Sequence, residues 1–169
     1  MRAKKFTAAV VLSVIAAVGF APLANAAVRP TTAQKLQLQY LIEEEKLARD
    51  VYLYLAANVT TAKFANIAKS EQTHMDQISV VLKTYNYFNP TTTRAPGVFR
   101  DKTLQALYNT LIAQGSVDVA AAMQVGRDIE NLDIKDLQVM LKSTMPADMK
   151  LALDNLLKGS YNHLAAFNR

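Results

Sequence analysis

The 169-residue sequence contains no cysteine and no tryptophan, and it has only five glycines and five prolines. Without cysteine, the chain has no thiolate nucleophile, no cysteine-ligated zinc site and no iron–sulfur cluster. The low content of glycine and proline excludes collagen-like and low-complexity disordered proteins, and the lack of cysteine also excludes a disulfide-stapled mini-protein. One ordinary globular domain is the simplest organisation that remains.

The N-terminal residues have the pattern of a secretory signal peptide. Three cations, Arg2, Lys4 and Lys5, precede a nearly apolar run at residues 6–20, and the small-x-small cleavage pattern Ala24-Asn25-Ala26 follows it. The charge-free run is about 15 residues long, which is shorter than the roughly 20 residues that cross a bilayer. We interpret the segment as a removable signal peptide, and an uncleaved membrane anchor is the alternative.

This interpretation predicts the organisation of the chain and its location. Residues 1–26 are the signal peptide, cleaved after Ala26, residues 27–33 are an N-terminal tether, and residues 34–169 form one domain. The protein is then periplasmic or secreted and contacts the membrane only transiently, during export. Removal of three cations lowers the formal net charge of +5 by three. No basic stripe remains that would indicate a nucleic-acid partner.

Within the domain, the apolar residues follow helical spacing nearly throughout, and no segment alternates long enough to predict a strand. The spacing predicts long helices at residues 33–57, 62–85, 117–141 and 146–167. A long connection between the second and third of these contains a short helix at residues 102–114. Asp101 is the expected N-cap of the short helix, Ser116 that of the third long helix, and Pro146 is expected in the first turn of the fourth. This pattern is typical of an all-α four-helix bundle with a long crossover that contains a short extra helix.

Each long helix interrupts its apolar face with polar residues near its middle. These are Glu45 (with Glu44 as an equally spaced alternative) and Tyr52 on the first helix, Glu71 and His74 on the second, Glu130 and Asp133 on the third, and Ser160 and His163 on the fourth. A buried carboxylate costs several kcal/mol unless it is paired, protonated or bound to a cation. The Glu71-x-x-His74 spacing places both side chains on one face, one turn apart. Carboxylates and imidazoles from facing helices suit iron, manganese or zinc, so the pattern predicts a metal site in the bundle core.

Each of these residues also has a simpler interpretation. Glu45 is spaced to pair with Arg49, either histidine alone could be an ordinary core residue, Glu130 and Asp133 could form an exposed edge facing Lys135, and Tyr52 could pack with its hydroxyl at the edge of the core. A metal-free bundle with a buried hydrogen-bond network would combine these interpretations.

At these positions the sequence resembles the ferritin-like superfamily. EKLARDVYLYL at residues 45–55 is similar to the rubrerythrin-type pattern of Glu, then Ala-Arg at three and four, then Tyr at seven. FANIAKSEQTHMDQI at residues 64–78 contains the Glu-x-x-His of that superfamily. EEEKLARDVY at residues 43–52 and NHLAAF at residues 162–167 resemble more narrowly a bacterial and archaeal ferritin-like family that is catalogued as a domain of unknown function. The resemblance extends over residues 36–167.

The resemblance implies a role for each polar residue of the bundle core. Glu45 would be the ligand from the first helix, Glu71 a bridging carboxylate, His74 the imidazole on the first metal, Glu130 the ligand from the third helix, and His163 the imidazole on the second metal. The sequence departs from the superfamily at Ser160, three residues before His163, where a second bridging carboxylate is expected. Asp133, one turn beyond Glu130, is a candidate replacement. Two equal metals, an unequal pair and a single metal therefore remain open.

Two iron ions are the cofactor that the resemblance implies, with manganese, zinc or a single metal as alternatives. A protein with such a centre would be an oxidoreductase that acts on O₂ or peroxide. Its electrons would come from an external donor, because the chain has no cysteine for a rubredoxin-like centre. A non-catalytic metal-sequestration or stress protein and a purely structural bundle are the competing functions. The sequence leaves catalytic turnover and assembly into a homo-oligomer open.

Overall fold

The computed structural model describes residues 28–59 and 61–169, and within these ranges the chain folds into five α-helices with no β-strand. The helices are α1 (Thr32–Asn58), α2 (Ala62–Thr84), α3 (Lys102–Gly115), α4 (Val119–Met140) and α5 (Ala147–Phe167). The prediction of an all-helical domain is confirmed for this part of the chain. The expected signal peptide, residues 1–26, lies outside the described residues. None of the described helices is both long enough and apolar enough to span a bilayer.

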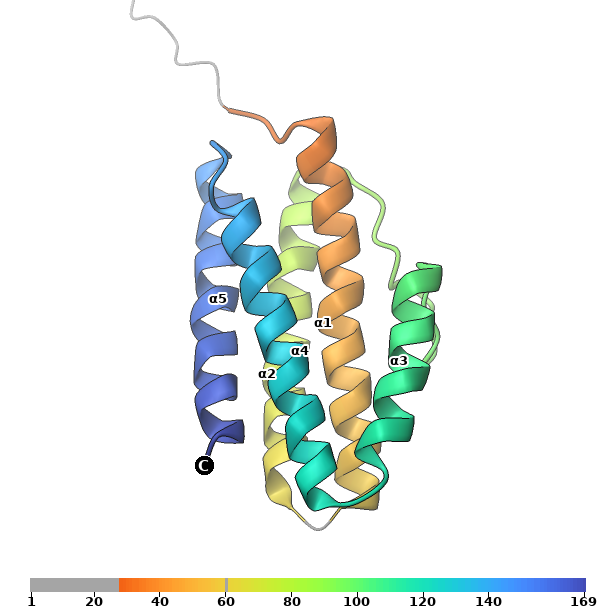
Figure 1. Cartoon of the computed structure of the whole chain (residues 1–169). Helices are drawn as coiled ribbons and strands as arrows, with labels where there is room; N and C mark the ends of the chain where they lie inside the picture. Colours follow the sequence, from red (N-terminus) through yellow and green to blue (C-terminus); the bar gives the residue numbers. More distant parts are fainter. Residues whose placement is uncertain (1–27, 60) are drawn as a thin grey trace, which may run out of the picture.

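Four long helices, α1, α2, α4 and α5, lie side by side as a helical bundle, and the shorter α3 lies on its outside (Figure 1). α1 packs against α2, α3 and α4, while α5 packs against α2 and α4. The connection at residues 85–101 carries the chain from the end of α2 to the start of α3. The bundle therefore brings the middles of four helices, which are far apart in the sequence, to one level.

Of the three helix starts for which the sequence predicts a particular residue, one agrees with the structure and two differ. The side chain of Asp101 caps α3, as predicted, and accepts hydrogen bonds from the backbone N–H groups of Thr103 and Leu104. Ser116 was the wrong residue for the cap of α4, because Asp118 accepts from the N–H of Ala121 and α4 begins two residues later than predicted.

Ser116 instead closes α3, where its hydroxyl donates to the carbonyl oxygen of Ile112. Pro146 is the N-cap residue of α5 and not part of its first turn, and it provides no side-chain cap. Pro146 has extended backbone angles (φ −56°, ψ 147°), so the first residue with helical geometry is Ala147.

The core consists of two apolar clusters with the polar residues of the bundle interior between them along the helices. One cluster contains Tyr52, Leu55, Phe64, Val125 and Phe167, from the C-terminal ends of α1 and α5 and the N-terminal ends of α2 and α4. The other contains Leu38, Ile78, Leu137, Met149 and Leu153, from the opposite ends of the same helices. The middle of each helix is thus left for Glu45, Glu71, Glu130, Ser160 and their neighbours.

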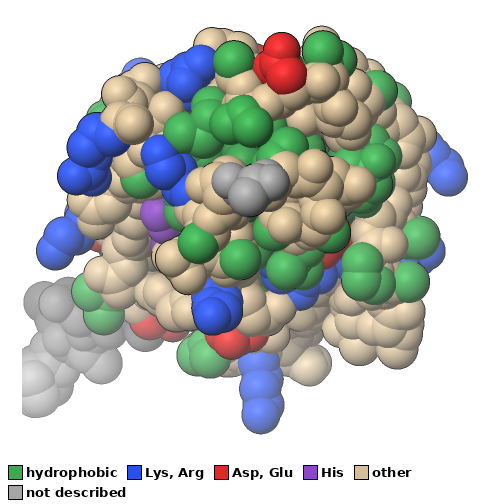
Figure 2. Space-filling view, turned by 90° about the horizontal axis from the view of Figure 1, so that it is seen from below, with side chains coloured by type: hydrophobic (Ala, Val, Ile, Leu, Met, Phe, Trp, Pro, Cys, Tyr) green, Lys and Arg blue, Asp and Glu red, His purple; other side chains and the backbone are tan. Residues whose placement is uncertain are grey.

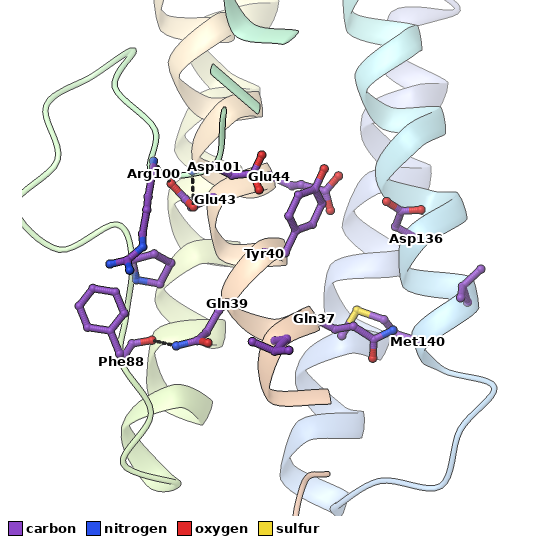
Figure 3. Close-up of a pocket in the computed structure, with 13 residues that line it drawn as sticks. Gln37, Gln39, Tyr40, Glu43, Glu44, Phe88, Arg100, Asp101, Asp136 and Met140 are labelled. Atoms are coloured by element: carbon purple, nitrogen blue, oxygen red, sulfur yellow. Dashed lines mark hydrogen bonds between the residues drawn. The ribbon is translucent and has the colours of Figure 1, made fainter. Parts of the chain in front are cut away.

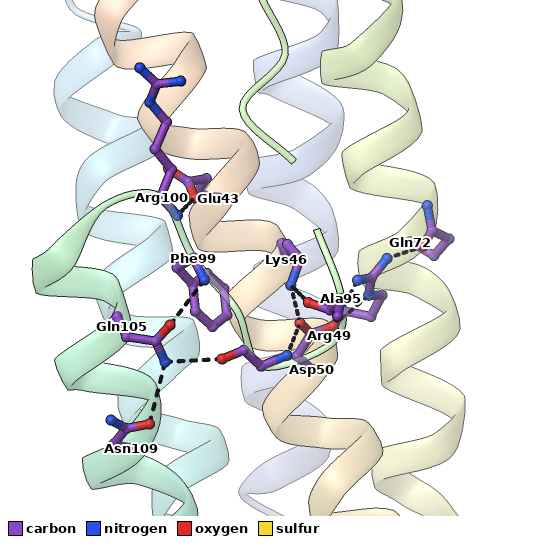
Figure 4. Close-up of polar contacts among 11 residues, drawn as sticks. Glu43, Lys46, Arg49, Asp50, Gln72, Ala95, Phe99, Arg100, Gln105 and Asn109 are labelled. Atoms are coloured by element: carbon purple, nitrogen blue, oxygen red, sulfur yellow. Dashed lines mark hydrogen bonds and ion pairs between the residues drawn. The ribbon is translucent and has the colours of Figure 1, made fainter. Parts of the chain in front are cut away.

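A buried ion pair ties the α2–α3 connection to α1. Lys46 is 1% exposed; it pairs with Asp50 one turn later, donates to the carbonyl oxygen of Ala95 at 2.9 Å, and lies 4.4 Å from the ring centre of Phe99 (Figure 4). Asp50 also accepts from the backbone N–H of Gly97, which has a positive φ of 73°. That backbone conformation is accessible to glycine at little cost. The connection is therefore held against the same face of α1 that supports α3.

The end of the bundle at which α1 gives way to α2 shows hydrophobic side chains among Lys and Arg, with few acidic side chains (Figure 2). Val117 and Val119, between α3 and α4, are among the exposed hydrophobic residues of the described chain. The acidic residues that are described below lie farther along the bundle, toward the start of α1.

Candidate metal centre

Five side chains from four helices meet in the middle of the bundle. They are Glu45 from α1, Glu71 and His74 from α2, Glu130 from α4 and His163 from α5, and none is more than 7% exposed. They form two groups of three, Glu45–Glu71–His74 and Glu71–Glu130–His163, and the ligand atoms within each group lie within 4.8 Å of one another. The structure therefore brings together all five residues that the sequence placed in the predicted metal site.

Glu71 belongs to both groups because its two oxygen atoms face different imidazoles. Its Oε2 lies 2.9 Å from Nδ1 of His74, and its Oε1 lies 2.8 Å from Nδ1 of His163. The two imidazole rings stack with their centres 5.4 Å apart. On the outer sides, Glu45 Oε2 lies 3.2 Å from Nδ1 of His74 and Glu130 Oε2 lies 3.5 Å from Nδ1 of His163. The arrangement is nearly symmetric about the Glu71 carboxylate.

Hydrogen bonds do not account for this arrangement. Within the described residues, Nδ1 of His163, Oε1 of Glu71 and Oε1 of Glu45 are buried without a hydrogen-bond partner, although the first two atoms are close. An unpartnered buried polar atom costs about 1–3 kcal/mol. Nitrogen and oxygen ligands that bind one ion at about 2.1 Å lie about 3 Å from each other, which is close to the spacing here. The donor set and its spacing therefore fit a cation.

Neighbouring residues fix the orientation of the His163 group. The hydroxyl of Ser70 lies 2.9 Å from Nε2 of His163, so this nitrogen has a polar partner on the outer side while Nδ1 faces Glu71 and Glu130. The hydroxyl of Tyr52 donates to Oε1 of Glu130 at 2.6 Å, so Tyr52 does more than pack at the edge of the core. Its ring lies against Phe64 and Phe167.

Gly159 makes room for the other imidazole. A Cβ atom at this position on α5 would lie 2.3 Å from Nε2 of His74, closer than real contacts allow. The sequence contains a signal for this residue, because a glycine in the interior of a helix costs about 1 kcal/mol and suggests a close approach. Ser70 has no comparable signal, since a serine beside the apolar face of a helix is ordinary.

Asp133 and Ser160 form a pair next to the Glu45–His74 group. The hydroxyl of Ser160 donates to Oδ2 of Asp133, while Oδ1 has no hydrogen-bond partner within the described residues. Asp133 belongs to neither group of three. It lines a small cavity of about 80 Å³ whose wall includes Glu45, Glu71 and Glu130 as well as leucines of α3. The free oxygen of Asp133 is thus available at the position where the sequence lacks a second carboxylate from α5.

Three consecutive glutamates on α1 have three different surroundings. Glu43 accepts from the backbone N–H groups of Arg100 and Asp101, at 2.5 and 3.2 Å, and so holds the start of α3 (Figure 4). Glu45 joins the central groups, whereas Glu44 belongs to neither of them. Successive helical residues differ by about 100° in direction, so neighbouring side chains necessarily face different parts of the structure. Of the two residues, the structure places Glu45 within a group of three and Glu44 outside both groups.

The simpler interpretations of these residues are not what the structure shows. Arg49 pairs with Asp50 and donates to Gln72, not to Glu45. Glu130 and Asp133 are both buried and do not form an exposed acidic edge. Neither imidazole is an isolated core histidine, because each contacts two carboxylates.

The electrostatics of the centre require positive charge among its carboxylates. Burial would lower the pKa of His74, but Glu45 and Glu71 raise it to about 11. Burial would also lower the pKa of His163, but Glu130 and Glu71 raise it to about 10. Burial raises the pKa of Glu45 and of Glu130 to about 8, whereas for Glu71 the two imidazoles outweigh burial and lower the pKa to about 2. Protons on the imidazoles, or a cation, balance the charge.

Residues 34–169 match a family described as "Uncharacterized protein domain (DUF2202)". The chain belongs to this family. The chain is also similar to "Uncharacterized protein MJ0754" of Methanocaldococcus jannaschii, with 45% identity over 127 residues, covering 75% of this chain and 69% of the relative. The crystal structure of the hypothetical protein MJ0754 has a TM-score of 0.79 and 42% identity, over 82% of this chain and 79% of that chain. The DUF2202 match contains all the central residues described above.

Proposed function

We propose that this DUF2202 protein is a ferritin-like metal-binding protein with a two-metal carboxylate and histidine centre. One ion would be held by Glu45, Glu71 and His74, and the other by Glu71, Glu130 and His163. The observation that carries the proposal is the position of Glu71, whose two carboxylate oxygens lie 2.9 and 2.8 Å from two different imidazole nitrogens. Buried atoms without hydrogen-bond partners at the same place support it.

The ferritin-like assignment is supported by the arrangement of helices and ligands. The four long helices each contribute to the centre, with Glu-x-x-His on α2 and single ligands on α1, α4 and α5. Carboxylate-bridged sites of this kind occur inside four-helix bundles. In place of a carboxylate at residue 160, we propose that Asp133 is supplied from α4, held by the hydroxyl of Ser160. The two half-sites would then be unequal in ligand charge.

Iron is the metal that we propose, with manganese or zinc as alternatives that the same ligands accept. Bound iron would supply redox chemistry toward O₂ or peroxide. The chain holds the ligands in position from rigid helices, and Tyr52 keeps Glu130 oriented through its hydrogen bond. The adjoining cavity of about 80 Å³ is walled partly by Leu104, Leu107 and Leu111, and its volume has room only for a small molecule. Electrons would come from an external donor.

A second candidate is metal sequestration without turnover, as in a stress protein. The same ligands and burial would hold ions without any reaction, and the lack of cysteine leaves the chain without a rubredoxin-like centre of its own. Export to the periplasm or the medium remains part of the proposal, and the N-terminal sequence of the protein recovered from its cells tests it. A mature chain that begins at Ala27 is the expected result.

The experiment that separates these functions is metal analysis followed by an oxidation assay. The chain is purified without chelators, its metals are measured by mass spectrometry, and ferrous oxidation with O₂ or peroxide is then followed. About two ions per chain with turnover support the oxidoreductase, because a two-metal site needs both ions. Two ions without turnover support sequestration. No metal, with an unchanged melting temperature on addition of iron, would contradict both and leave a structural bundle.

A further inference from the structure

Glu44 is a buried carboxylate for which the described residues provide no partner. Glu44 is 6% exposed, and neither of its carboxylate oxygens has a hydrogen-bond partner within residues 28–59 and 61–169. Its neighbours on α1, Glu43 and Glu45, both have partners. A buried carboxyl group without a hydrogen-bond partner is costly whether it is charged or neutral, so this position is suited to a ligand that its oxygens can bind.

Glu44 lies at the inner side of a large surface pocket. The pocket has a volume of about 790 Å³ and lies between α1, the end of α4 and the connection before α3 (Figure 3). Its other acidic residues are Glu43, Asp101 and Asp136. Glu43 and Asp101 already accept backbone hydrogen bonds around the start of α3. Glu44 and the half-buried Asp136, which face each other from α1 and α4, are the carboxylates that remain available for a ligand.

Glu44 also lines the small inner cavity, together with Glu45, Glu71 and Asp133. It therefore belongs to the walls of both spaces, one open to the surface and one beside the central residues. The central ligands are at most 7% exposed, so an ion needs a route to reach them. Because both spaces share Glu44 in their walls, an ion that passed from the pocket to the centre would pass its carboxylate.

We propose that Glu44 and Asp136 form a divalent-cation site at the floor of the pocket, through which metal ions enter the central site. Carboxylate oxygens alone select hard cations such as Mn²⁺ or Fe²⁺. Two carboxylates without an imidazole hold such an ion more weakly than the central groups, which suits transfer. The role in entry rests on the proposed function, whereas binding of an ion in the pocket does not.

The binding test uses Mn²⁺ and the full chain, with bound and free ion distinguished by electron paramagnetic resonance. Glu71→Gln, which impairs the centre, is expected to retain one weakly bound Mn²⁺, and the further change Glu44→Gln is expected to remove it. Asp154→Asn, at an exposed acid on α5, is the matched control and should leave it in place. Retention of the weak ion in the double variant would overturn the proposal.

The entry test follows the rate at which Co²⁺ reaches the centre, by its absorbance after rapid mixing. Glu44→Gln is expected to slow loading by about tenfold or more, since focused negative potential raises association rates by at least that factor. The amount of Co²⁺ that finally occupies the central site is expected to equal that of the parent. Parent-like loading in Glu44→Gln would overturn the entry role. Circular dichroism checks that the Glu44→Gln variant is folded. If it is not, Asp136→Asn, at a half-buried position, is tested for slow loading in its place.

The two proposals fail in different ways. If Mn²⁺ binds in a manner that depends on Glu44 but no ion binds in a manner that depends on Glu71, the pocket site stands and the proposed centre is wrong. If Glu71 is needed for metal but Glu44 affects neither binding nor rate, the centre stands and the pocket site is wrong.

Discussion

Two buried polar clusters share helix α1, and they differ in whether the chain satisfies them. Around Lys46 and Asp50, a cation, an anion, a backbone carbonyl and a backbone N–H meet as matched donors and acceptors. Around Glu71, carboxylates and imidazoles converge with three atoms left unpartnered in the described structure. The first cluster is complete as it stands and fastens the α2–α3 connection. The second needs added positive charge, which is how a binding site differs from a structural ion pair.

The largest effect is expected from Glu71→Gln, which removes charge from both metal groups at once. Metal content should fall from about two ions per chain to less than half an ion, because a bridging ligand serves both ions of a two-metal site. Mass spectrometry measures the number of metal ions per chain in the parent and in the variant. Arg49→Ala, which changes a charge on the same level of α1 but outside the centre, should leave the metal content nearly unchanged. Parent-like metal content in Glu71→Gln would place the site elsewhere.

Lys46→Met is expected to affect stability and not metal content. It leaves Asp50 buried with Arg49 as its remaining cation, whereas a buried charge that loses its only partner costs about 3–5 kcal/mol. The free energy of unfolding, from urea titration, should therefore fall by up to about 3 kcal/mol. Lys150→Met breaks a pair with the same i, i+4 spacing to Asp154 at an exposed site, where the loss is about 0–1 kcal/mol. Equal losses in the two variants would contradict the structural role of Lys46.

The pH dependence of the metal-free protein follows from the centre. The pKa values of Glu45 and Glu130 rise from 4.5 to about 8, and those of His74 and His163 rise from 6.5 to about 11 and 10. All four groups bind protons more tightly in the folded state, so stability is lost as pH rises from about 5 through 8 and beyond. The pKa of Glu71 is lowered from 4.5 to about 2, so its contribution to the stability of the folded state is lost as pH falls from 4.5 to about 2.

Bound metal replaces these protons, so the gain in melting temperature on adding Mn²⁺ should increase between pH 5 and 8. Melting curves with chelator and with Mn²⁺, at matched pH, provide the comparison. The opposite result is a melting temperature with chelator that rises between pH 5 and 8, together with a gain from Mn²⁺ that stays constant. It would show that the central groups do not control the pH dependence of stability.

The smallest effect is expected from Tyr52→Phe. The ring remains packed against Phe64 and Phe167, but Glu130 loses a hydrogen bond of 2.6 Å. Loss of a residue that orients a ligand weakens metal binding by about tenfold or more. One of the two ions should therefore dissociate more readily in a competition with chelator, while the fold is retained. Identical release of both ions in parent and variant would mean that Tyr52 only packs.

Periodicity was sufficient to place Glu71, His74, Glu130 and His163 in the bundle interior, because each lies on the apolar face of a helix, where the direction of a side chain follows from its position. It could not separate Glu44 from Glu45, since both fit an apolar face until the neighbouring helices are known. It also gave no indication that Lys46 is buried, because that depends on the path of residues 85–101 across α1. Ser116 and Asp118 are both good caps, and only the length of the α3–α4 turn selects Asp118.

The most direct test of the central claim is anomalous diffraction from crystals of the metal-loaded protein, recorded at the absorption edge of the metal. The account predicts two peaks on either side of the Glu71 carboxylate, one about 2.1 Å from Nδ1 of His74 and the other about 2.1 Å from Nδ1 of His163. Peaks confined to the protein surface, with both imidazoles still in direct contact with carboxylates, would contradict it.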